Sequence, residues 1–173
     1  MQNGFETQFG ESFVGDGVNA AHINTVLGAR GGPVEVAWAS ALAQPRQGHV
    51  AFVTVVRPGL PVKPFTLFVN KSFISGDRHA EMTWGPAQAG VATGVADAVA
   101  DGTVDRNAVD RLLLIAAVWV NPAADDAEAV YVNNVRATYQ SLRAGQAGHP
   151  PLNDVLSVRH APCNPFFRPS GPR

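Results

Sequence analysis

The sequence predicts a single domain of layered strands and helices, an α/β or α+β sandwich. Its 173 residues fit one domain of ordinary size. Apolar residues make up 46% of the chain, which is enough to bury a sizeable core. Segments with strand character alternate with segments of helical spacing, as in layered folds. No repeat or linker divides the chain, so we expect one domain over residues 1–173.

Four segments have the composition of β-strands. Residues 20–27 follow a glycine-rich turn, alternate loosely and carry His22. Residues 49–56 are rich in β-branched side chains and predict a buried strand, and residues 66–74 predict another. Residues 111–120 are apolar on both faces, which is typical of a central strand.

Three segments have helical spacing. Residues 34–43 follow Pro33, which suits the first turn of a helix. Residues 85–100 begin with Gly-Pro and are rich in glycine and alanine, so this helix can pack closely against a neighbour. Residues 123–144 carry one apolar stripe and two aspartates expected in the first turn. From residue 145 to residue 173 the frequent prolines predict an extended tail.

The composition argues against several classes of protein. The net charge is -1 and there is no basic run, so a nucleic-acid partner is not expected. The longest apolar run, residues 112–120, is too short to span a bilayer, and the first residues lack the pattern of a signal peptide. The single cysteine, Cys163, fits a reducing cytoplasm. Charged residues make up only 16%, which suggests that surface is buried between subunits.

The sequence supports no local metal site. There is no cysteine pair, and no two histidines lie within four residues of each other: His22, His49, His79, His149 and His160. A site assembled from distant residues stays open.

Two residue types are candidates for chemistry. The His22 imidazole follows a glycine turn and titrates near neutral pH, so it can give or take a proton; the alternative is a hydrogen-bonded histidine with a structural role. Lys63 and Lys71 are the only lysines among 13 basic residues. An ammonium group can bond singly to a carbonyl or react as an amine once deprotonated, whereas the alternative is a solvated surface lysine.

Gln88 is a third candidate, in the first turn of the expected helix over residues 85–100. Its amide offers both a donor and an acceptor, which suits the edge of a heterocycle. A plain surface glutamine is the alternative.

A series of short motifs, in order and with nearly constant spacing over residues 10–145, resembles the formaldehyde-activating enzyme family (tetrahydromethanopterin hydro-lyases). The resembling stretches are Gly10-Glu11 through Gly17, Ala21-His22-Ile23, Gly28 with Arg30-Gly31, Leu60-Pro61 with Lys63-Pro64, Asn70-Lys71, Gly85-Pro86-Ala87-Gln88 with Gly90-Val91-Ala92, and Ala123-Ala124-Asp125-Asp126-Ala127.

The resemblance implies an α+β two-layer sandwich, with a β-sheet and helices packed on one face. It also implies a cytoplasmic homopentamer with pterin sites between subunits. The implied reaction is condensation of formaldehyde with tetrahydromethanopterin, or a related reduced pterin, to methylene-tetrahydropterin and water. This is a carbon-nitrogen hydro-lyase activity of one-carbon metabolism and formaldehyde detoxification. Tetrahydromethanopterin is then a co-substrate, and no tightly bound cofactor is expected.

The resemblance also assigns roles to residues. His22 is the matched proton donor, and Lys71 and Gln88 are the matched pterin contacts. Asn24 and Val53 stand at substrate-binding positions where the family usually has Asp and Leu, and Phe73 stands where it has Thr.

Two further hypotheses stay open, the first of them motivated by Asn24 and Phe73. In one, the chain is an inactive paralogue that binds a pterin or formaldehyde adduct as a carrier or sensor. In the other, it is a structural partner of an authentic enzyme.

Overall fold

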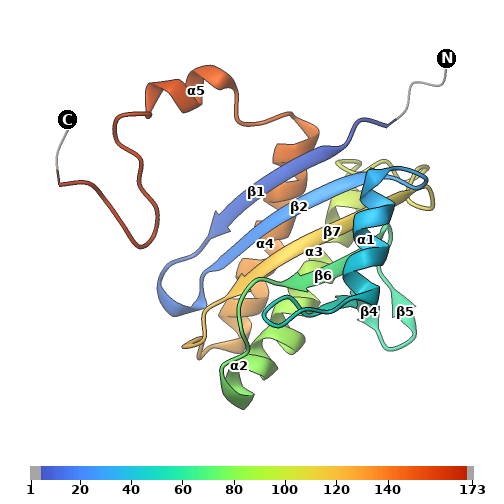
Figure 1. The fold of residues 1–173 in the computed structure, drawn as a ribbon, viewed down its shortest axis with the longest axis horizontal. Helices are drawn as coiled ribbons and strands as arrows, with labels where there is room; N and C mark the ends of the chain where they lie inside the picture. Colours follow the sequence, from blue (N-terminus) through green and yellow to red (C-terminus); the bar gives the residue numbers. More distant parts are fainter. Residues whose placement is uncertain (1–4, 171–173) are drawn as a thin grey trace.

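The computed structural model describes residues 5–170 and is built on a five-stranded sheet (Figure 1). The strands lie in the order β1-β2-β7-β6-β3, and all neighbours are antiparallel except the parallel pair β6 and β7. A separate ribbon of two short strands, β4 and β5, lies beside this sheet. The strands span Gln8–Val14 (β1), Ala21–Ala29 (β2), Ala51–Val53 (β3), Val55–Arg57 (β4), Leu60–Pro61 (β5), Phe65–Asn70 (β6) and Leu112–Val120 (β7).

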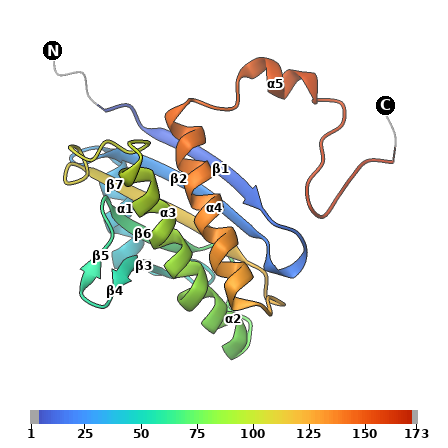
Figure 2. The same cartoon turned by 180° about the vertical axis from the view of Figure 1, so that it is seen from behind.

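The helices cover the two faces of the sheet unequally. The long helices α3 (Gln88–Ala100) and α4 (Ala127–Gln146) lie side by side across one face (Figure 2). The shorter α1 (Pro33–Ala43) lies on the opposite face, near one end of β2, where Val34 packs over Gly28. A mixed sheet layered with helices confirms the α+β sandwich, to which α1 adds a partial cover on the second face.

The core lies between the sheet and the helices α3 and α4. Successive residues of a strand point to opposite faces, so alternate residues of β2 enter this core. Ala21, Ile23 and Leu27 are buried there, against Val91 and Val95 of α3 and their neighbours. The central position predicted for residues 111–120 is confirmed, because β7 pairs on both sides.

Close packing of α3 on α4 depends on two glycines, as the small-residue composition predicts. A Cβ added at Gly90 would lie 2.6 Å from the carbonyl oxygen of Tyr131, and one at Gly94 would lie 2.6 Å from that of Val135. Neither backbone oxygen can move without displacing α4, so a larger residue would force the helices apart.

Two strand predictions need correction, and one strand was not predicted. The segment 49–56 is not one buried strand, because the chain changes sheets at Thr54: its N–H donates to Thr66 of β6, while its carbonyl accepts from Val62 beyond β5. The resulting β3 is a partly buried edge strand. The strand predicted over 66–74 ends at Asn70. Strand β1, at the other edge, is not among the predicted strands.

The helix starts also differ from prediction. The Gly-Pro pair at 85–86 does not open a helix, because α2 (Gly76–Met82) continues through a π-helical turn, Thr83–Ala87, into α3. A π turn accommodates Pro86, which lacks a backbone N–H. Helix α4 begins after Asp126, whose side chain accepts a hydrogen bond from the N–H of Ala129. Asp126 therefore caps the helix rather than lying in its first turn.

The tail is not extended throughout. Helix α4 continues to Gln146, and Leu152–Ser157 form the short helix α5. The chain then turns back toward β7, where the Phe166 ring meets the Trp119 ring edge-on with centroids 5.8 Å apart. Within residues 5–170, no helix is long and apolar enough to cross a membrane.

Candidate active site

The face of the sheet turned away from α3 and α4, here called the open face, carries the candidate chemistry. His22 and Asn24 point to this face because their neighbours Ala21, Ile23 and Thr25 are buried on the other one. The antiparallel register places Glu11 of β1 opposite Asn24. Helix α1 covers only one end of this face, so His22 stays partly exposed, at 35% of its side chain.

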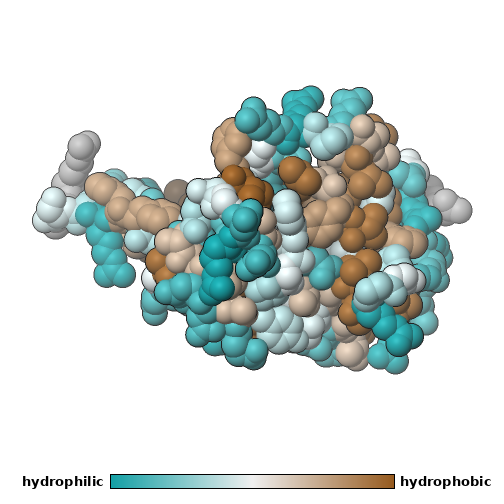
Figure 3. Space-filling model, turned by 90° about the horizontal axis from the view of Figure 1, so that it is seen from below, coloured by the Kyte–Doolittle hydropathy of each residue, from teal (hydrophilic) through white to brown (hydrophobic). Residues whose placement is uncertain are grey.

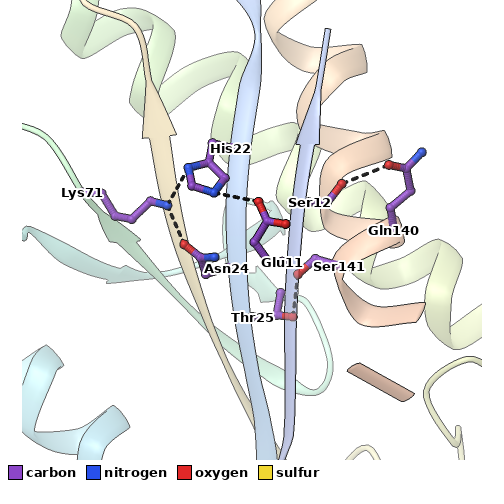
Figure 4. Close-up of polar contacts among 8 residues, drawn as sticks. All are labelled: Glu11, Ser12, His22, Asn24, Thr25, Lys71, Gln140 and Ser141. Carbon is purple, nitrogen blue, oxygen red and sulfur yellow. Dashed lines mark hydrogen bonds and ion pairs between the residues drawn. The ribbon is translucent and has the colours of Figure 1, made fainter. Parts of the chain in front are cut away.

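Four polar side chains meet on the open face and are called here the His22 cluster: Glu11, His22, Asn24 and Lys71 (Figure 4). The Nε2 atom of His22 lies 2.9 Å from a carboxylate oxygen of Glu11. The Nζ atom of Lys71 lies 3.4 Å from Nδ1 of His22 and donates to Oδ1 of Asn24 at 2.7 Å. Three residues proposed from the sequence, His22, Asn24 and Lys71, are thus brought together.

Lys71 reaches the cluster from two strands away. It follows β6, and its backbone N–H donates to Val118 of β7, so it continues the parallel ladder by one residue. Its side chain then crosses β7 to meet His22 and Asn24 on β2. Ala117, which pairs with Asn24 in the register, is small and leaves room for this crossing.

The environment of the cluster lowers the pKa of two groups. Burial lowers the pKa of the His22 imidazole below 6.5, and the Lys71 ammonium lowers it further, while the Glu11 carboxylate opposes both effects. Burial also lowers the pKa of Lys71 below 10.5, and Glu11 again opposes the shift. Because Glu11 accepts the proton on Nε2, the network assigns the lone pair of neutral His22 to Nδ1, facing Lys71.

The polar groups behind the sheet have a different character. Ser12 donates to Gln140, and the hydroxyls of Thr25 and Ser141 share a hydrogen bond of 2.8 Å (Figure 4). Both pairs tie β1 and β2 to α4. The pair of Thr25 and Ser141 is buried and therefore structural, whereas Gln140 is exposed at the surface of α4.

Two predicted site residues lie away from the cluster. Val53 of β3 lies in register with Leu67 of β6, Ile115 of β7 and Val26 of β2. Val53 is therefore three strands away from β2, at the level of a residue that lies four positions from His22. The side-chain oxygen of Gln88 accepts from the backbone N–H of Val55 at 2.7 Å. Val53 and Gln88 therefore flank the same end of β4 and form a second group.

Glu11 is the cluster member that had no assigned role in the sequence. It lies within one of the quoted motifs, but its meeting with His22 depends on β1, which the sequence pattern did not reveal. Phe73 is 63% exposed and lies against Gly48, outside the cluster.

A cavity of about 670 Å³ is lined by Phe13 and Trp119, the residues that pair with His22 on the two neighbouring strands, whereas His22 itself does not line it. The turn between β1 and β2 and tail residues 163–168 form its other walls. Figure 3 shows the tail as an arm beside the body. A volume of this size accommodates a bicyclic ligand. Among the residues that the structure describes, no group of three or more His, Cys, Asp or Glu side chains is arranged to hold a metal ion.

Comparison with known proteins gives a consistent result. The family model for "Formaldehyde-activating enzyme (Fae)" matches residues 9–167. The chain is 37% identical over 166 residues to the 5,6,7,8-tetrahydromethanopterin hydro-lyase of Methanosarcina barkeri, covering 96% of this chain and 93% of that protein.

Larger relatives match over part of their length. The chain is 38% identical to the bifunctional enzyme Fae/Hps of Methanosarcina barkeri, over 86% of this chain and 38% of that protein. It is 34% identical to the bifunctional enzyme Fae/Hps of Archaeoglobus fulgidus, over 93% of this chain and 41% of that protein. The chain thus spans about two fifths of the length of these bifunctional relatives.

Proposed function

The chain belongs to the formaldehyde-activating enzyme family, and on that premise we propose that it condenses formaldehyde with tetrahydromethanopterin, or a related reduced pterin, releasing water. The observation that carries the proposal is the His22 cluster, which joins a carboxylate, an imidazole and an amine on an open face. This is carbon-nitrogen lyase chemistry in the direction of condensation.

His22 is the acid and base of this reaction. A secondary amine of the pterin adds to formaldehyde and gives a carbinolamine, which must lose its hydroxyl as water before the second amine closes the ring. Since the pKa of His22 is lowered, the imidazole is largely neutral at pH 7 and first takes the proton that the attacking amine releases. It then gives this proton to the oxygen of the adduct, which makes the neutral carbinolamine. The proton that the second amine gives up during ring closure reaches the hydroxyl through His22, so that the oxygen leaves as water. Such proton donation to a departing oxygen accelerates reactions by about 10² to 10⁴-fold.

Glu11 and Asn24 support this proton transfer. The Glu11 carboxylate, 2.9 Å from Nε2, stabilises the imidazolium that forms for part of the cycle. Asn24 holds the Lys71 ammonium through its side-chain oxygen and leaves its own amide group free to donate to a pterin.

The substrate-binding residues fall into two groups, which supports a site shared between two copies of the chain. Lys71 and Asn24 belong to the His22 cluster, whereas Val53 and Gln88 lie near β4, too far away for one pterin ring to contact both groups in a single chain. Exposed apolar residues of the tail, including Leu152, Val158 and Phe166, supply surface for subunit contact. The homopentamer and the cytoplasmic location implied by the family resemblance stay predictions.

The test of the function is the rate of methylene-tetrahydropterin formation from formaldehyde and several reduced pterins, with and without the protein. We expect an acceleration with tetrahydromethanopterin. Saturable pterin binding without acceleration would instead favour the carrier, and no binding of any reduced pterin would contradict both functions.

The shared site is tested by mixing two variants, His22→Asn and Gln88→Ala, after dissociation and reassembly. If each site takes His22 from one copy and Gln88 from another, the mixture regains activity that neither variant has alone, because some sites receive two intact halves. A mixture no more active than the sum of its parts would contradict a shared site.

A further inference from the structure

The two lysines of the chain occupy opposite environments. Lys63 is exposed and forms an ion pair with the carboxylate of Asp110, and this pairing lowers the pKa of Asp110. Lys71 is partly buried and bonds to two groups without negative charge, His22 Nδ1 and Asn24 Oδ1. Among residues 5–170, no carboxylate lies within ion-pair distance of Lys71.

This environment makes the ammonium of Lys71 easier to deprotonate than that of an exposed lysine. Removing an ammonium from water without a carboxylate partner destabilises its charged form, and the pKa of Lys71 is lowered accordingly. The lone pair on His22 Nδ1 is 3.4 Å away and can accept the proton that the ammonium gives up. The resulting imidazolium is stabilised by Glu11 on the other side of the ring.

We propose that Lys71 is a catalytic nucleophile that captures formaldehyde as a protein-bound iminium before the carbon passes to the pterin. The inference deepens the proposed function and rests on it, with the iminium of Lys71 taking the place of the direct addition of the pterin amine to formaldehyde. A free amine next to an acid-base group is the arrangement in which lysines form Schiff bases with carbonyl compounds.

The capture step is balanced by the groups of the cluster. The ammonium of Lys71 first gives one proton to His22. The Lys71 nitrogen then forms a bond to the carbon of formaldehyde, and His22 gives the proton to the formaldehyde oxygen. The Lys71 nitrogen then gives a second proton to His22, which leaves a neutral carbinolamine. The carbon–oxygen bond breaks as His22 protonates the oxygen, so that water leaves and the nitrogen lone pair forms the iminium. The net change is ammonium plus formaldehyde to iminium plus water.

The transfer step restores the lysine. One secondary amine of the reduced pterin bonds to the iminium carbon and passes its proton to Lys71. The second amine then displaces the Lys71 nitrogen from that carbon. The proton of this second amine passes to the Lys71 nitrogen, which becomes an ammonium again. The pterin gains a methylene bridge, and no oxidant or reductant is consumed.

The test traps the iminium in the wild-type protein. Native protein is treated at pH 7 with ¹³C-formaldehyde and cyanoborohydride, without pterin, and digested with chymotrypsin. This protease cuts after Phe65 and Phe68, which lie between the two lysines. We expect Lys71 to acquire label at least about tenfold faster than Lys63. The difference should disappear in urea, where both side chains are solvated. Equal labelling in the native protein would overturn the proposal.

A chase with pterin separates an intermediate from a side reaction. Tetrahydromethanopterin added before the reductant should remove the label from Lys71 and deliver ¹³C to the methylene product. Label that stays on Lys71 would overturn the proposal.

Two variants sharpen the result. Asn24→Asp places a carboxylate beside the Lys71 amine and should slow its labelling toward the rate of Lys63, because the carboxylate stabilises the ammonium and raises its pKa. Lys71→Arg keeps the charge and the donors but forms no iminium, so condensation should fall by about 10²-fold or more, while Lys63→Arg retains the wild-type rate. Full activity of Lys71→Arg would overturn the proposal.

Failure of the inference is distinguishable from failure of the function. If the wild-type protein accelerates condensation without selective labelling of Lys71, the proposed function holds and Lys71 is not the nucleophile. A protein that does not accelerate condensation at all would lose both.

Discussion

The two faces of the sheet are built from the same strands but serve different purposes. On the covered face, β2 contributes Ile23 and Leu27 to a core closed by α3 and α4. On the open face, His22 and Asn24, the two neighbours of Ile23, join Glu11 and Lys71 in a polar cluster. Because side chains alternate along a strand, one residue of β2 stabilises the fold and the next is free for chemistry.

Substitutions at neighbouring positions of β2 should therefore separate stability from activity. A residue of the covered face should change the free energy of unfolding and leave the rate per folded molecule unchanged. A residue of the open face should do the reverse.

The largest expected loss of stability is at Ile23, which is fully buried between β2 and the helices. Ile23→Ala should lower the free energy of unfolding by about 2–5 kcal/mol, because it removes buried methyl groups and leaves a cavity. Urea denaturation measures this loss. Val26→Ala on the open face is the matched control, with an expected loss of about 1 kcal/mol, since Val26 is only partly buried. Equal losses at the two positions would contradict the assignment of the faces.

The next largest effect is at the contact between α3 and α4. Gly94→Val should lower the free energy of unfolding by about 1–3 kcal/mol, because the new side chain would meet the Val135 carbonyl oxygen and Thr138. A thermal melt or urea titration measures it. Gly85→Ala is the control, since an added Cβ there meets nothing within 4 Å. If both variants were equally stable, the close packing of the two helices would be wrong.

The sequence predicted the covered face better than the open one. Hydrophobic periodicity identified β2, β7, α1 and α4 because burial imposes a pattern on contiguous residues. The break at Thr54 was missed because it depends on hydrogen bonds with Thr66 and Val62, and the π turn around Pro86 was missed because Gly-Pro is also typical of a helix start.

The candidate site was predictable only in part. His22, Asn24 and Lys71 were identified through the family resemblance, and the structure brings them together. Glu11 had no assigned role because its meeting with His22 requires the register between β1 and β2. The distance of Val53 and Gln88 from the cluster also follows from strand order, which no local pattern encodes.

A smaller effect is expected at Glu11 on the open face. Its carboxylate raises the pKa of His22, so Glu11→Gln should lower that pKa further and reduce the condensation rate by about tenfold. An NMR titration of the His22 ring measures the pKa, and the same sample gives the rate. Ser12→Ala, at the adjacent covered position, should change neither. An unchanged pKa in Glu11→Gln would show that the carboxylate does not act on the imidazole.

The smallest expected effect is the pH dependence of stability due to His22. The pKa of His22 in the folded protein is below 6.5, so the unfolded chain binds a proton at this residue at a higher pH than the folded chain does. The free energy of unfolding should therefore fall as the pH decreases from about 6.5 toward the pKa of the folded state. Urea titrations of wild type and His22→Asn across this range isolate the contribution, which should be absent in the variant. Parallel pH profiles would contradict the lowered pKa.

The most direct measurement is the single-turnover rate at which wild type and His22→Asn convert formaldehyde and tetrahydromethanopterin to the methylene product. Asparagine keeps a polar side chain at this position but has no group that titrates near neutral pH. The account predicts a wild-type rate well above the uncatalysed one and a loss of about 10² to 10⁴-fold in the variant, with little change in stability. Equal rates for the two proteins would contradict the assignment of the chemistry to the open face.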